Sequence, residues 1–470
     1  MQFLSLEFTL GLALLFLLYW IIPRRKWQNF LLLVASLGMV SYFGWNALLV
    51  LVVSTFLEWV IALKVGKTSS PPVRKKLLWL SVILNLSQLA FFKYSEFFIP
   101  EVSRVLFFFG IQTKAIHILM PVGLSFWTLQ KMTLTLDVFY KRKPSEKNFF
   151  RALIFTSFFP CLLSGPIEYS RKLLPQLEKD RKWNTQTFSE GVWLFAVGAF
   201  LKAVLADNVA VSAEALLGPG SSGISVLIGI WAYALQIFGD FAGYSYMARG
   251  CARFLGIDIT QNFLAPYLMR NLSDFWKHWH ISLSAWLNEF IFSPLSLKLR
   301  NWGTASIVIA VWVTFVTSGL WHGTGLTFFV YGCIHALGIT LFTLSKSSRK
   351  KMKDRFGSGP LLGWMAVALT FNWVCFGYLF FRAGTLSMAF SQIHSLFLGS
   401  WNPLTVSCDW TVFALSALAV FGLQAMVLAQ KNVFWIFEKP VWFRVLFYLI
   451  LGFLLLRCYA PSDRFIYFQF

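Results

Sequence analysis

Residues 303–344 read GTASIVIAVWVTFVTSGLWHGTGLTFFVYGCIHALGITLFTL. This stretch holds two apolar runs, 303–320 and 324–344, and a helix needs about 20 such residues to cross the hydrocarbon core of a bilayer. The short segment between the runs carries His322 and is rich in glycine. The stretch therefore predicts two membrane helices with a histidine between them.

Similar runs recur along the whole chain. Of its 470 residues, 57% are hydrophobic and 13% are charged, against about a quarter charged in an ordinary soluble domain. We expect one all-α polytopic membrane domain over residues 1–470, with about 11 to 13 crossing or re-entrant helices. The expected crossings are 3–22, 29–43, 46–65, 77–98, 117–138, 188–206, 224–247, 303–320, 324–344, 361–381, 410–430 and 441–460.

The excess of positive charge predicts the orientation. The chain has 41 Lys and Arg against 20 Asp and Glu, a formal net charge of +21. In so apolar a protein this excess marks cytoplasmic loops rather than a nucleic-acid site, so no nucleic-acid partner is expected. The basic loops at 24–26, 67–76, 141–143 and 346–355 place the N-terminus outside the cytoplasm.

Two segments depart from this pattern. Residues 149–168 have basic residues on both sides and contain Pro160, Gly165 and Pro166, which interrupt a helix. We interpret this segment as re-entrant and as the lining of a cytoplasm-facing cavity, because irregular backbone at membrane depth must be buried or line water. Residues 258–300 are less apolar and fit an interfacial or cavity-lining segment. The tryptophans expected at the headgroup boundary there are Trp276, Trp279 and Trp286.

Histidines are the first candidates for chemistry, since imidazole exchanges protons near neutral pH. His322 is either a structural residue bonded to a carbonyl or a general base beside a narrow channel. His280 precedes Ser282 and stands two residues after His278, so we expect only one of the two histidines to face a given cavity. His335 fits packing within an apolar helix. The histidines expected at the interface are His117 and His394.

Two carboxylates, Asp240 and Glu58, lie within apolar runs, where each needs a partner or a wet cavity. A hydrogen-bond hub is the favoured interpretation of Asp240, because small and hydroxyl-bearing residues surround it. Ion coupling in a transporter is the alternative. The six cysteines are scattered and show no spacing typical of a metal site, so no metal is expected.

Seven stretches carry more specific information. They are MPVGLSFWTLQKMTLTLDVFY (120–140), SFFPCLLSGPIEYSRKLLPQL (157–177), LQIFGDFAGYSYMARG (235–250), SDFWKHWHISLSAWL (273–287), SGLWHGTGLTFFVYG (318–332), FFRA (380–383) and FIYFQF (465–470). Together, and in this order, they resemble the membrane-bound O-acyltransferase family, and most closely its bacterial alginate O-acetyltransferase membrane subunits.

The resemblance implies a ring of tilted transmembrane helices around a thinned centre, with a catalytic tunnel. It implies that His322 is the general base and that His280 is a second polar residue of the same passage. The residues expected to line or support that passage are Asp240, Trp276, Trp279, Ser282 and Trp321.

The same resemblance implies a function in the bacterial cytoplasmic membrane. An acetyl group from a cytoplasmic thioester, with acetyl-CoA as the expected co-substrate and no tightly bound cofactor, would cross to an extracytoplasmic esterase-like transferase that modifies a polysaccharide. Tyr467, in the aromatic C-terminal tail 465–470, would be an acyl relay or an interfacial anchor. The alternatives are D-alanyl transfer from a carrier protein to teichoic acid, and a transporter or flippase.

Overall fold

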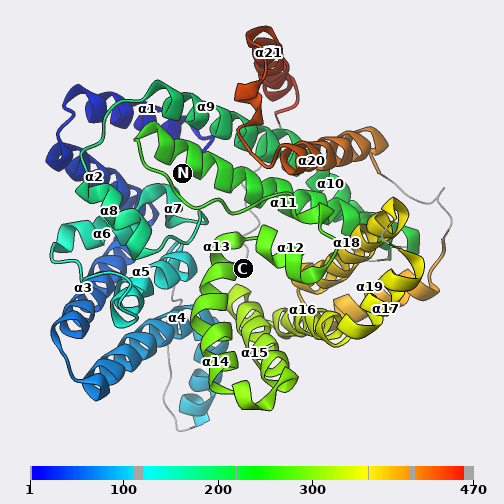
Figure 1. Ribbon diagram of the computed structural model, residues 1–470, viewed down its shortest axis with the longest axis horizontal. Coiled ribbons are helices and arrows are strands. Elements are labelled where there is room, and N and C mark those ends of the chain that lie inside the picture. The colour runs from blue at the N-terminus through cyan, green and yellow to red at the C-terminus, as the bar shows by residue number, and fades with distance from the viewer. Residues whose placement is uncertain are drawn as a thin grey trace. The chain divides into compact units, whose positions relative to one another are not determined.

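The computed structural model describes residues 3–108, 120–218, 220–221, 223–357, 359–401 and 408–459 (Figure 1). All regular elements in these ranges are helices, which confirms the predicted all-α class. The chain divides into two compact units. Unit 1 comprises Met1–Val192 and Ala248–Thr260, and unit 2 comprises Trp193–Met247 and Gln261–Phe470.

Within the described residues, eight helical stretches are long and apolar enough to cross a membrane. They are Trp45–Lys67, Pro71–Ser95, Thr185–Leu216, Gly223–Phe254, Thr304–His322, Leu326–Leu344, Pro360–Arg382 and Trp410–Gln430. Two shorter apolar helices are α1 (Leu6–Ile21) and α19 (Leu386–Leu398). The polytopic prediction is therefore confirmed, with fewer full-length candidates than the 11 to 13 crossing or re-entrant helices expected.

Besides the crossing expected at 3–22, which falls on α1, three expected crossings are helical but are not among these eight. They fall on α2 (Arg25–Phe43), α5 (Leu124–Phe139) and α21 (Val441–Arg457). α5 has 16 residues and α21 has 17, which is short of the roughly 20 that span a bilayer core.

Unit 1 packs around α5, whose side chains from Phe126 to Val138 are all buried. α3 (Trp45–Lys67) and α4 (Pro71–Phe108) lie against it. Gly123 precedes α5 with a φ of 71°, and a Cβ there would collide with the carbonyl oxygen of Leu162. Glycine is needed at this position on both counts.

The predicted interruption of 149–168 is confirmed. α6 (Phe149–Ser157) and α7 (Phe159–Leu162) are separate short helices, and non-helical chain leads to α8 (Ser170–Glu178). Nine residues of α6 rise about 14 Å, less than half of a bilayer core. Every side chain from Ala152 to Ser170 is buried, as irregular backbone at membrane depth requires.

In unit 2, α15 (Thr304–His322) and α16 (Leu326–Leu344) are the two predicted membrane helices, and they lie side by side (Figure 1). Gly319 and Gly332 make this close approach feasible. A Cβ on Gly319 would collide with the carbonyl oxygen of Phe328, and one on Gly332 would collide with the chain of α15.

Residues 258–300 contain three short α-helices: α12 (Leu272–His278), α13 (Ile281–Leu287) and α14 (Ser293–Lys298). The tryptophans expected at the headgroup boundary are instead buried within the protein, because aromatic side chains pack on them. Their exposed fractions are 8% for Trp276, 3% for Trp279 and 6% for Trp286. Residues 261–287 therefore contribute buried side chains to the interior of unit 2, whereas α14 has none.

Candidate active site at His280 and His322

His322 is the last residue of α15, and its side chain is buried. Gly323 follows in an extended conformation, so the helix ends at the histidine and the chain turns toward α16. Aromatic rings surround the imidazole. Its centroid lies 5.2 Å from that of Phe381 on α18 (Pro360–Arg382) and 6.0 Å from that of Tyr331.

His280 lies between α12 and α13 in a left-handed backbone conformation, with φ 44° and ψ 53°. Residues other than glycine adopt this conformation rarely, and such strain is typical of functional sites. The side chain is 1% exposed. Its ring packs edge-on against Phe241 of α11 (Gly223–Phe254), with 4.7 Å between the centroids.

Trp321 contacts both histidines. Its ring centroid lies 4.9 Å from that of His322 and 6.2 Å from that of His280. The fold of unit 2 therefore brings the two histidines that the sequence singled out to one indole ring.

Asn262 decides which nitrogen of His280 carries the hydrogen. The backbone N–H of Ser282 donates to Oδ1 of Asn262 at 3.1 Å, and the Ser282 hydroxyl donates to it at 2.7 Å. A backbone N–H can only donate, so this atom must be the amide oxygen. Nδ1 of His280 lies 3.4 Å from the same oxygen and is therefore the protonated nitrogen. The neutral ring then has its lone pair on Nε2.

Burial keeps His280 neutral. The loss of solvation lowers its pKa from an ordinary 6.5 to about 3. At physiological pH the ring is thus an uncharged base with Nε2 as acceptor. So low a pKa makes Nε2 a weak base, so His280 fits a hydrogen bond to a substrate better than removal of its proton.

The profile described as MBOAT, membrane-bound O-acyltransferase family, matches residues 30–385. The chain belongs to the membrane-bound O-acyltransferase family. As a member it is an O-acyltransferase, which agrees with the resemblance carried by its motifs.

Named relatives cover most of the chain. The probable alginate O-acetylase AlgI of Azotobacter vinelandii is 30% identical over 434 residues, 91% of this chain and 81% of that protein. The peptidoglycan O-acetyltransferase of Helicobacter pylori is 29% identical over 396 residues, 78% of this chain and 73% of that protein. The teichoic acid D-alanyltransferase of Bacillus subtilis is 26% identical over 281 residues, 55% of this chain and 68% of that protein.

Two other residues predicted for the candidate site, Ser282 and Trp279, lie on the same segment as His280. The Ser282 hydroxyl donates its hydrogen bond to Oδ1 of Asn262. It therefore orients the amide rather than acting as a nucleophile. Trp279 packs among aromatic rings, 5.9 Å from Tyr267 and 5.0 Å from Phe263 between centroids. Sequence reasoning missed Asn262, because one amide among apolar residues carries no local signal.

His335 has the packing role that the sequence predicted. Nε1 of Trp276 donates to Nδ1 of His335 at 3.3 Å, and the two ring centroids lie 4.9 Å apart. The Tyr331 ring, which also contacts His322, lies 4.7 Å from the His335 ring. His335 and Trp276 thus pack behind Tyr331, on the side away from His322.

Asp240 belongs to a buried ion-pair cluster. Its carboxylate lies 2.6 Å from Nζ of Lys202, which also lies 2.8 Å from Asp207. Lys202 lies in η1 (Phe200–Ala206), a π-helical turn between α9 (Thr185–Ala199) and α10 (Asp207–Leu216). The sequence interpretation expected hydroxyl-bearing and close-packed neighbours around Asp240 and did not name this lysine partner.

Glu58 is a hydrogen-bond hub of unit 1. Its carboxylate accepts hydrogen bonds from the Ser81 hydroxyl at 2.8 Å and from Nδ2 of Asn85 at 2.7 Å. These donors satisfy a carboxylate that is buried within a candidate membrane span.

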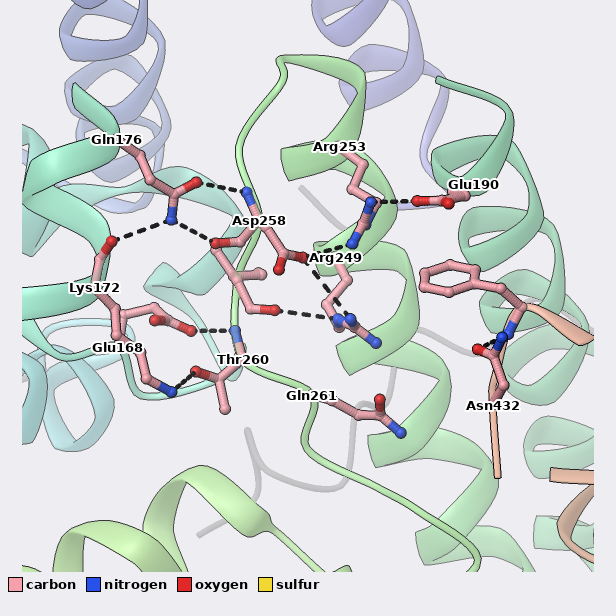
Figure 2. A network of polar contacts seen from close by, with 12 residues as sticks. Glu168, Lys172, Gln176, Glu190, Arg249, Arg253, Asp258, Thr260, Gln261 and Asn432 are labelled. Carbon is pink, nitrogen blue, oxygen red and sulfur yellow. Dashed lines mark hydrogen bonds and ion pairs between the residues drawn. The ribbon is translucent and has the colours of Figure 1, made fainter. Parts of the chain in front are cut away.

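A second polar network in unit 1 fastens the chain after α11 to α8 (Figure 2). Gln176 bonds both the N–H and the C=O of Asp258, at 2.9 and 2.8 Å. The carboxylate of Glu168, from the GPIEYS motif, accepts the N–H of Thr260. Arg253 pairs with Asp258 at 3.0 Å. The backbone of 258–260 is therefore fixed just before Asn262 in the sequence.

Some predicted residues lie outside the described ranges. These are His117, Tyr467 and the rest of the tail 465–470. Among the residues that the structure describes, no group of three or more His, Cys, Asp or Glu is arranged to hold a metal ion.

Proposed function

We propose that this protein transfers an acetyl group from acetyl-CoA in the cytoplasm across a bacterial cytoplasmic membrane, for O-acetylation of an extracytoplasmic polysaccharide by a partner esterase-like transferase. The observation that carries the proposal is the contact of His280 and His322 with one indole ring, with His280 held neutral. The similarity to a probable alginate O-acetylase and to a peptidoglycan O-acetyltransferase supports the choice of acetyl.

The proposed reaction is attack of a hydroxyl oxygen on the thioester carbonyl. A C–O bond forms and the C–S bond breaks, which releases the thiol. His322 takes the hydroxyl proton as general base and returns it to the leaving thiolate. His280, through Nε2, orients the acceptor or the thioester by a hydrogen bond.

Tyr467 is the proposed relay nucleophile for this transfer. Acetylation of its phenol would give an aryl ester with a good leaving group for the partner transferase. α21, from which the tail extends, belongs to unit 2 as the histidines do. The carbonyl of Cys458 accepts a hydrogen bond from Asn208 of α10 at 2.9 Å, which anchors the chain nine residues before Tyr467.

D-Alanyl transfer from a carrier-protein thioester is the second candidate function. The similarity to the teichoic acid D-alanyltransferase favours it, although it covers 55% of this chain. Incubation of the purified protein with labelled acetyl-CoA or with an aminoacyl carrier protein separates the two donors, because only the true donor is consumed in a His322-dependent way.

Mass spectrometry of the C-terminal peptide tests the relay. We expect an acetylated Phe465–Phe470 peptide after incubation with acetyl-CoA, absent from Tyr467→Phe and from His322→Ala. Undiminished transfer in Tyr467→Phe would remove Tyr467 from the mechanism and leave the acyl transfer itself intact.

A further inference from the structure

We propose that Arg382 and Tyr233 bind an oxyanion, a carboxylate or phosphate group carried by the final acyl acceptor, the polysaccharide that receives the acetyl group after Tyr467. The inference deepens the acyl transfer proposed above and rests on it for the identity of the acceptor. It gives a role to the FFRA motif (380–383), which the proposed chemistry leaves unused.

Arg382 directly follows a residue of the candidate site, Phe381, in the sequence. It is the last residue of α18. The ring of Phe381 lies 5.2 Å from that of His322 and 5.1 Å from that of Tyr331, between centroids. The arginine is therefore one residue removed from the aromatic wall of the site.

The guanidinium of Arg382 lacks an acceptor within the described part of the chain. It is half-buried, and its central carbon lies 5.9 Å from the ring centroid of Tyr233. No described carboxylate or carbonyl accepts a hydrogen bond from it. Asp240, the buried carboxylate seven residues after Tyr233, is held by Lys202. The five N–H donors of the Arg382 guanidinium thus have the Tyr233 ring beside them and no described carboxylate as an acceptor.

Tyr233 gives an independent sign of a missing acceptor. The residue is 4% exposed, and its hydroxyl finds no hydrogen-bond partner among the described residues. A buried hydroxyl without a partner is unfavourable, and native proteins rarely leave one. An oxyanion beside Arg382 would satisfy both groups.

A structural role explains only half of this arrangement. A cation at a helix C-terminus interacts favourably with the helix dipole, so Arg382 alone would need no ligand. The dipole does not account for the buried hydroxyl of Tyr233. The planar fork of arginine donors, with a phenol nearby, matches the geometry of carboxylate and phosphate oxygens.

The predicted orientation assigns the oxyanion to the acceptor. The basic segment 346–355 precedes α18 and is predicted to be cytoplasmic. α18 is long enough to cross the membrane, so Arg382 at its far end would face the extracytoplasmic side. The acceptor arrives from that side, whereas the phosphates of acetyl-CoA remain on the other. An anionic lipid headgroup of the outer leaflet has the same chemistry.

Thermal unfolding of the full-length protein in phosphatidylcholine nanodiscs tests the site without donor or turnover. We expect glucuronate and inorganic phosphate to raise the Tm saturably, while glucose does not. Arg382→Gln should weaken this binding about tenfold or more, and Tyr233→Phe by a smaller factor. Lys277→Gln is the matched control, because Lys277 is an exposed cation that pairs with Asp274.

The outcomes separate the proposals. Unchanged binding in Arg382→Gln, or no effect of either anion on the wild type, would overturn the site. An Arg382-dependent rise that appears only when phosphatidylglycerol replaces phosphatidylcholine would assign the oxyanion to lipid and overturn the acceptor assignment. Arg382→Lys keeps the positive charge and is the control for misfolding, because its Tm without added anion shows whether substitution at this position destabilises the protein. His322→Ala should bind glucuronate normally, so loss of acyl transfer alone would not count against the site.

Discussion

Nδ1 of His280 lies 3.4 Å from Oδ1 of Asn262, an oxygen that already accepts two hydrogen bonds from Ser282. The Ser282 N–H identifies the oxygen, and the oxygen in turn identifies the protonated nitrogen of the imidazole. Asn262, which contacts no substrate in the proposed reaction, therefore determines the tautomer of His280, which does contact substrate.

Replacement of Asn262 by Leu should lower kcat more than it raises KM. The variant removes the acceptor that holds His280 in one tautomer, so Nε2 no longer presents its lone pair uniformly. A small misplacement of a reacting group can cost about 10²-fold in rate, and we expect a loss of that order. Asn262→Asp keeps an oxygen acceptor and should recover part of the rate. Equal kcat in wild type and Asn262→Leu would refute the positioning role.

The lowered pKa of His280 predicts a loss of stability in acid. In the unfolded chain this histidine titrates near pH 6.5, whereas in the folded protein it titrates at about 3. Between these values the unfolded state binds more protons, so the His280 contribution is complete above about pH 6.5 and is lost as the pH falls toward 3.

Thermal unfolding at pH 7.5, 6 and 5 measures this effect. His280→Asn should show a smaller fall in Tm over the range than the wild type, since asparagine tolerates the left-handed backbone and does not titrate. His394→Asn, at an exposed position on α19, should show the same fall in Tm as the wild type. Parallel curves for His280→Asn and wild type would contradict burial of a neutral imidazole.

Gly319→Ala should destabilise the pair of helices α15 and α16. The added Cβ would collide with the carbonyl oxygen of Phe328, so the helices must separate, at a typical cost of about 1–3 kcal/mol. Gly422→Ala is the control, since a Cβ at that helical position of α20 (Trp410–Gln430) meets nothing within 4 Å. A Tm for Gly319→Ala equal to that of Gly422→Ala would show that the close contact is absent.

Lys202→Met should destabilise the protein strongly. It leaves the carboxylates of Asp207 and Asp240 buried without the ammonium that lies 2.8 and 2.6 Å from them, and removal of one partner from a buried pair costs about 3–5 kcal/mol. Conversion of both carboxylates to amides in the same chain, Asp207→Asn with Asp240→Asn, should restore much of the loss. Denaturant unfolding in detergent measures both steps, and a stable Lys202→Met protein would argue against the cluster as a structural hub.

The parts of the fold that the sequence predicted are those set by local composition. Two apolar runs of membrane length around His322 predicted α15 and α16, and the prolines and glycine of 149–168 predicted the break after α6. The long hydrophobic runs could not reveal which helices are buried in protein. α5 reads as a crossing from its composition, but its 16 residues are packed on all sides by the rest of unit 1.

The sequence predicted the site residues that stand out individually. It missed the residues whose role depends on a partner distant in the sequence. His280 and His322 are polar groups in apolar surroundings, so the cost of burying them marked both. Asn262 and Lys202 act through partners 20 and 38 residues away, Ser282 and Asp240. The lysine in the mostly apolar run 188–206 was nevertheless a usable signal, since a buried ammonium needs a carboxylate partner.

The most direct test of the account is transfer of labelled acetyl from acetyl-CoA by the purified, full-length protein, with His322→Ala compared with His394→Ala at matched amounts of folded protein. We predict that His322→Ala loses at least about 100-fold in rate, the minimum expected for a general base, while His394→Ala retains the wild-type rate. Wild-type transfer by His322→Ala would contradict the assignment of His322 as the catalytic base.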